Sequence, residues 1–137
     1  MFGRFTRRLT RVAPLVGSCL LLGAVAQAST PISVTASPKT VSRGQRVTFA
    51  GSGWGVIEFC KPQVTLTLRR SPPLSPLVIA NVNLRTAPKT SGTFGTSWTV
   101  PRTVHSGLRT IVATQHCESG KNGATVLITR STRMRVR

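Results

Sequence analysis

The chain has 137 residues, of which 19 are lysine or arginine and two are acidic, so its formal net charge is +17 at pH 7. That length is enough for one domain of ordinary size with its own core. A net charge of this size attracts polyanions at long range, although arginine outnumbers lysine 15 to 4, as a GC-rich genome alone also produces.

Residues 1–28 are predicted to be a secretory signal peptide that is cleaved after Ala28, which places the mature protein outside the cytoplasm. Four arginines precede an uncharged apolar run over 12–26, and Ala26-Gln27-Ala28 has the small-x-small form of a cleavage site. The run of 15 residues is shorter than the roughly 20 of a membrane-spanning helix, so no transmembrane segment is expected in the mature chain. The alternative is a lipidated N-terminus at Cys19, because Val16-Gly17-Ser18-Cys19 resembles a lipobox.

The remaining 109 residues carry 15 basic and two acidic side chains, a net charge of about +13, and two cysteines. In an exported protein, Cys60 and Cys117 are expected to form a disulfide. Closing a loop of that length stabilises the fold by roughly 4 kcal/mol in chain-entropy bookkeeping. A metal site built from these cysteines with His105 and His116 is disfavoured, because zinc sites place four ligands at tight spacing. No metal or cofactor is therefore expected.

Alternation of apolar and polar residues between glycine and proline turns predicts seven strands. In chain order the strand candidates are residues 32–36, a strand within the glycine-bounded stretch 44–55, and 63–70, 77–84, 93–100, 109–116 and 124–129. Residues 39–43 are expected to be a connector. The domain is placed at 29–130, followed by a basic C-terminal tail over 131–137, although Met134 and Val136 offer an extension of the last strand.

Seven short strands in about 100 residues, without a helical apolar stripe, predict an all-β protein with one immunoglobulin-like β-sandwich. The second and sixth predicted strands would face each other across the core. Cys60 is expected in the loop after the second strand, and Cys117 just after the sixth. The disulfide would then staple one end of the sandwich and bring Glu58 and Glu118 close to that end.

A resemblance supports this fold. Modules of the immunoglobulin-like class in exported bacterial proteins are similar to this chain in the patterns Gly44-x-x-Val47-x-Phe49-x-Gly51-x-Gly53-Trp54, Ser91-Gly92-Thr93-Phe94 and Trp98-x-Val100-Pro101. The opening also resembles the neocarzinostatin-type apoproteins, secreted sandwiches that carry an enediyne chromophore in a cleft. Those proteins usually have two disulfides and tend to be acidic, whereas this chain is basic and has cysteines for one.

Two groups of residues are candidates for contact with a ligand or partner. Trp54, Glu58 and Glu118 are candidate ligand-facing residues near the disulfide, whereas Trp98 is assigned to the core with Phe94. The two glutamates are expected to form surface salt bridges with Lys61 and Lys121, and their use as a glycosidase-like pair is a remote alternative. Candidate contacts with anionic polymers are Arg43, Arg46, Arg69, Arg70, Arg130, Arg133, Arg135 and Arg137.

These observations predict an exported, non-enzymatic module without catalytic residues, with a structural or interaction role at the cell envelope. Its expected partners are anionic envelope polymers or another exported protein, and no specific nucleic acid. The alternative function is a secreted small-molecule carrier or antimicrobial apoprotein with a cleft near the disulfide.

Overall fold

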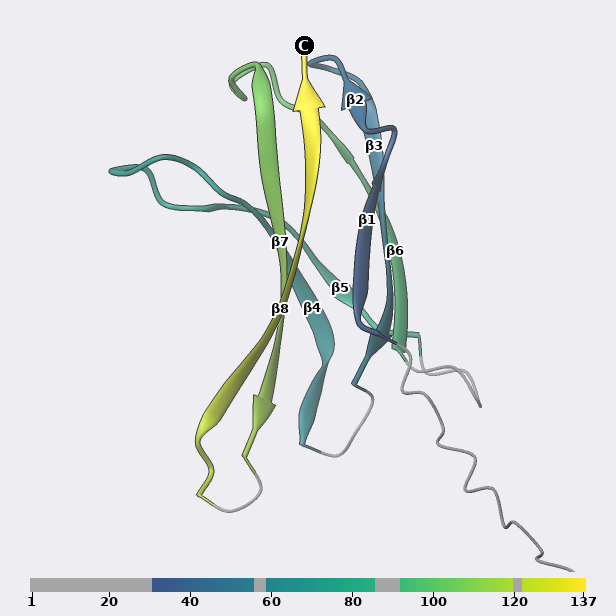
Figure 1. Cartoon of the computed structure of the whole chain (residues 1–137), viewed down its shortest axis with the longest axis vertical. Coiled ribbons are helices and arrows are strands. Elements are labelled where there is room, and N and C mark those ends of the chain that lie inside the picture. Colours follow the sequence, from purple (N-terminus) through teal and green to yellow (C-terminus); the bar gives the residue numbers. More distant parts are fainter. Residues whose placement is uncertain (1–30, 56–58, 86–91, 120–121) are drawn as a thin grey trace, which may run out of the picture.

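A computed structural model describes residues 31–55, 59–85, 92–119 and 122–137, and within these ranges the regular structure is all β. The strands are β1 (Ser33–Ser37), β2 (Thr40–Val41), β3 (Arg46–Trp54), β4 (Cys60–Leu68), β5 (Leu77–Asn83), β6 (Gly92–Thr99), β7 (Gly107–Glu118) and β8 (Thr125–Val136) (Figure 1). In the described part of the chain, no helix is long and apolar enough to span a membrane. The predicted signal peptide, with Cys19, and Glu58 lie outside the described residues.

The strands form two sheets that pack face to face (Figure 1). One sheet has the order β1-β3-β6, and the other has the order β2-β8-β7-β4-β5. Neighbouring strands are antiparallel except β2 and β8, which are parallel. An immunoglobulin sandwich likewise divides its strands between two packed antiparallel sheets. The prediction of an all-β sandwich is confirmed, with eight strands in the described residues rather than the seven predicted.

The core lies between the two sheets and follows the alternation in the sequence. Val47 and Phe49 of β3 point inward from one layer, and Leu66 and Ile111 point inward from the other, all with no exposed surface. Burying each such side chain contributes about 1.5–3 kcal/mol to folding. Trp98 is half-buried and packs against this core, as expected from its place on the same face as Phe94.

Two predicted boundaries are wrong. The connector over 39–43 contains β2, which is too short to show alternation. The predicted tail over 131–137 is instead the second half of β8, which pairs with β7 from Thr125 to Val136. Met134 and Val136 are buried in the core while Arg133 and Arg135 point to solvent. The segment was predicted to be a tail because its high positive charge was given more weight than its alternation of apolar and charged residues.

The disulfide joins Cys60 and Cys117, as expected, but its position in the fold differs from the prediction. The two residues are direct partners on the neighbouring antiparallel strands β4 and β7, so the bond lies within one sheet. Both cysteines belong to strands rather than to loops. The start of β4 was missed because a register shift between Cys60 and Val64 interrupts the alternation there.

Gln115 holds the same end of the sandwich together. Its side chain is fully buried, and its amide Nε2 donates to the carbonyl of Gly55 at 2.7 Å and to that of Lys61 at 2.9 Å. These bonds tie strand β7 to Gly55, which follows β3, and to Lys61 near the start of β4. The disulfide and this glutamine fasten the same region independently.

Gly51 of β3 is the position where the core tolerates no side chain. It lies opposite Phe94 of β6, and a Cβ atom at Gly51 would lie 2.6 Å from Phe94 Cζ. We expect Gly51→Ala to lower the free energy of unfolding by about 1–3 kcal/mol, because the ring must move within a packed core. Urea denaturation followed by tryptophan fluorescence measures this change.

Gly95→Ala is the matched control, because Gly95 is exposed in the adjacent strand and a Cβ atom there meets nothing within 4 Å. Its unfolding free energy should stay within about 0.5 kcal/mol of the wild type. Phe94→Leu combined with Gly51→Ala should recover part of the loss. Equal stabilities of Gly51→Ala and Gly95→Ala would contradict the proposed overlap.

Candidate anion-binding end

The directions of the strands bring four chain segments to one end of the sandwich. At this end β3 begins beside the end of β6, β4 ends opposite Ile111 of β7, and β8 ends beside the start of β7. Figure 1 shows the end of β8 there, together with the loop that projects from between β4 and β5. We call this the basic end, formed by residues 38–46, 69–76, 100–110 and 133–137, and call the opposite end the disulfide end.

Most of the described cations lie at the basic end. They are Lys39, Arg43, Arg46, Arg69, Arg70, Arg102, Arg109, Arg133, Arg135 and Arg137. Arg70 and Arg109 are half-buried and the other eight side chains are exposed. Elsewhere in the described ranges, the lysines and arginines are Lys61, Arg85 and Arg130.

Backbone hydrogen bonds hold these segments together. The amide of Gly44 donates to the carbonyl of Val100 at 2.7 Å, and Gly44 has a φ of 83°, a conformation that favours glycine. The amide of Arg135 donates to the carbonyl of Lys39 at 2.8 Å. The arginines near residues 43, 100 and 135 therefore project from one rigid platform, although they are far apart in the sequence.

Seven of the eight arginines predicted from the sequence as anion contacts lie at the basic end, and Arg130 does not. Arg130 pairs with Ala113 further along β8, and its Nε donates to the carbonyl of Ile32 at 3.2 Å. The sequence reasoning missed Lys39, Arg102 and Arg109. None of the three has another lysine or arginine within three residues of it in the sequence, so no local cluster of charge marked it.

The basic end has little negative charge to balance it. In the described ranges, Glu118 is the only carboxylate side chain, and it is exposed at the disulfide end. Like charges gathered without counter-charges raise the local positive potential and attract anions. Screening in physiological salt acts over about 8 Å, so this attraction operates on anions close to the surface.

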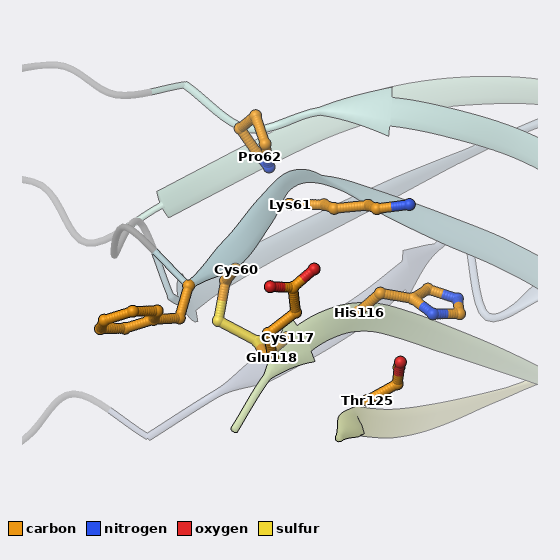
Figure 2. A pocket seen from close by; sticks show the side chains of 8 residues that line it. Cys60, Lys61, Pro62, His116, Cys117, Glu118 and Thr125 are labelled. Atoms are coloured by element: carbon orange, nitrogen blue, oxygen red, sulfur yellow. A yellow bond between two sulfur atoms is a disulfide. The ribbon is translucent and has the colours of Figure 1, made fainter. Parts of the chain in front are cut away.

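The disulfide end has a pocket of about 360 Å³ beside the Cys60–Cys117 bond. Figure 2 shows Lys61, His116 and Glu118 around it, from strands β4 and β7. Its lining is mixed in polarity, and its residues include the disulfide itself. Glu118 therefore remains a candidate for ligand contact, while Glu58 lies outside the described residues.

The prediction that Trp54 faces a ligand is wrong. Its side chain is fully buried, its Nε1 donates to the carbonyl of Ser33 at 3.0 Å, and its ring lies 6.1 Å from that of Phe94. The sequence did not predict this burial, because the glycines on either side of Trp54 do not indicate whether other strands cover its ring. Trp54 closes the core at the disulfide end and is not available to a ligand.

Three of the four residues weighed for a metal site lie together, but two of them are joined in the disulfide and the fourth is at the other end. Cys60 and Cys117 are bonded to each other, His116 is beside the disulfide, and His105 is at the basic end. Over the ranges that the structure covers, no group of three or more histidine, cysteine or acidic residues is arranged to hold a metal ion.

No protein-family model matches the sequence, and no curated protein matches it. Among solved structures, neutral ceramidase from Pseudomonas aeruginosa is similar, with a TM-score of 0.51, 13% identity, and coverage of 83% of this chain and 20% of the ceramidase. Murine CRIg has a TM-score of 0.42 at 13% identity, covering 79% of this chain and 99% of CRIg. This chain spans about a fifth of the ceramidase, and the likeness shows a shared fold alone.

Proposed function

We propose that this protein is an exported, non-enzymatic immunoglobulin-like module whose basic end adheres to anionic polymers of the cell envelope. The observation that carries the proposal is the gathering of ten cationic side chains from four chain segments at one end of the sandwich. Export is supported by the signal-like residues 1–28 and by the disulfide, which persists in oxidising compartments.

A polymer suits this end better than a single small anion does. The eight exposed cations belong to four separate chain segments and include residues of loops and of strand ends. A linear polyanion contacts several of them at once and releases its condensed counterions, which makes binding favourable and sensitive to salt.

The distribution of side chains also supports a binding role rather than catalysis. The ionisable side chains described at the basic end are lysines, arginines and His105. None of them is paired there with a carboxylate or a thiol, so these described residues form no pair of nucleophile and general base. The alternative of a carrier with a cleft near the disulfide has less support, because Trp54 is buried in the core.

The test is the retention of the purified protein on immobilised heparin and on an isolated anionic wall polymer as sodium chloride increases. If about six cations engage the polymer, log K should fall with log salt at a slope of about −5, a loss of roughly 10³ in affinity between 50 and 200 mM. Dextran of matched length is the neutral control and should not retain the protein. Absent or salt-independent retention on both polyanions would rule out the proposal.

A further inference from the structure

Two loops at the basic end enclose a pocket of about 330 Å³, which we call the loop pocket. The β4–β5 loop provides one wall and the β6–β7 loop provides the other. Its apolar lining includes Leu68, Leu74, Leu77 and Val104, of which Leu74 is exposed, Leu77 is half-buried, and Leu68 and Val104 are buried. Arginines 69, 70 and 109 also line it.

The first wall is held in shape by its own hydrogen bonds and by prolines. The amide of Leu74 donates to the carbonyl of Ser71 at 3.1 Å, which closes a turn. The Nε of Arg70 donates to the carbonyl of Ser75 at 2.6 Å across the base of the loop. Prolines at 72, 73 and 76 restrict the backbone further. This projecting loop (Figure 1) is therefore formed before any ligand arrives.

The second wall is fixed in the same way. The amide of Val104 donates to the carbonyl of Pro101 at 3.1 Å, which turns the chain and buries the valine. Arg109 reaches back from β7 to this loop, where its Nε donates to the carbonyl of His105 at 2.8 Å and its Nη2 to that of Ser106 at 2.9 Å.

These hydrogen bonds set the electrostatics of the pocket. The partners of Arg70 and Arg109 are neutral carbonyls, so the guanidinium groups are oriented without losing their net charge. A second hollow of about 300 Å³ also borders Arg69, Arg70 and Arg109. The same three arginines therefore line both hollows. Oriented guanidinium groups bind carboxylates through paired, charge-assisted hydrogen bonds.

We propose that the loop pocket binds a medium-chain fatty acid, with its alkyl chain against Leu74 and Leu77 and its carboxylate on Arg70 and Arg109. A hydrophilic polymer gains no favourable free energy from contact with the apolar surface, and the arginines repel cationic amphiphiles. The volume lies near the lower limit of about 300 Å³ for ligand pockets, which suits one short chain rather than a two-chain lipid. This site goes beyond the proposed function, because adhesion to a polymer does not require an apolar cavity.

Isothermal titration of the mature chain with decanoate, kept below its micelle concentration, tests the site. We expect saturable binding of one decanoate per protein. Acetate supplies the charge without the chain, and decyltrimethylammonium supplies the chain with the opposite charge, so neither should bind measurably. Binding of decyltrimethylammonium as tight as that of decanoate, or no binding of decanoate, would overturn the proposal.

Two variants locate the site. Leu77→Ser removes half-buried apolar surface and should weaken decanoate binding about tenfold, and Arg70→Gln should weaken it about tenfold by removing a charged donor. Leu127→Ser and Arg85→Gln replace the same residue types near the disulfide end and should leave the affinity unchanged. Decanoate affinity equal to that of the wild type in both pocket variants would overturn the assignment, provided that circular dichroism shows them folded. In the event that a variant does not fold, the ligand series on the wild type decides.

The two proposals fail in different ways. Leu77→Ser leaves every charge in place, so it should keep the salt slope of polymer retention while binding decanoate more weakly. Retention on heparin without binding of decanoate would refute the fatty-acid site alone.

Discussion

Replacing Arg46, Arg133 and Arg135 together by glutamine is expected to weaken polyanion binding on the order of tenfold to a hundredfold at low salt. All three side chains are exposed at the basic end, at the start of β3 and near the end of β8. Each lost contact should also make the slope of log K against log salt shallower by about 0.9. Heparin retention and fluorescence titration at several salt concentrations measure both quantities.

The control has the same change in net charge at other places. Replacing Lys61, Arg85 and Arg130 by glutamine also removes three exposed cations. If only total charge mattered, the two triple variants would bind equally weakly. If the basic end is the contact surface, the control keeps its salt slope and stays within about threefold of the wild-type affinity. Identical losses in the two variants would refute a localised contact surface.

Replacing both Cys60 and Cys117 by alanine is expected to produce the largest loss of stability. The bond closes a loop of 57 residues in sequence separation, and the chain-entropy model gives about 4 kcal/mol for its removal. For a domain of this size the melting temperature should fall by about 15–30 °C. Differential scanning calorimetry of the oxidised protein and of the double variant measures the difference.

Reductant provides the control for this experiment. It should lower the melting temperature of the wild type towards that of the double variant and leave the variant itself unchanged. Because the disulfide lies at the opposite end from the arginines, the folded variant should retain the wild-type salt slope on heparin at low temperature. A double variant with the same melting temperature as the oxidised wild type would show that Gln115 and strand pairing alone stabilise the disulfide end.

Alternation in the sequence was sufficient to predict seven of the eight strands described by the structure. It works where one face of a strand is buried, as for Val47 and Phe49, because the period of two then separates core from solvent. It failed for β2, which has only two residues. In β8 the alternation of Met134 and Val136 with arginines was visible, but the high local charge suggested a tail.

The candidate sites were less predictable, because they depend on register and on contacts between loops. Pairing of Cys60 with Cys117 followed from the cysteine count, whereas their common sheet followed only from the register of β4 and β7. The burial of Trp54 depends on a hydrogen bond to Ser33 in another strand. The loop pocket brings residues near 70 and near 105 together across two loops, and no local pattern in the sequence encodes that meeting.

The separation of charge along the sandwich also determines how the molecule meets a surface. Ten cations at one end, against Lys61, Arg85 and Glu118 near the other, make the charge of the described residues uneven along the strands and give them an electric dipole in that direction. The field of an anionic surface turns such a dipole before contact and makes encounters in one orientation more frequent. Adsorbed molecules would then stand upright as an aligned layer, with the disulfide end facing outward in every copy.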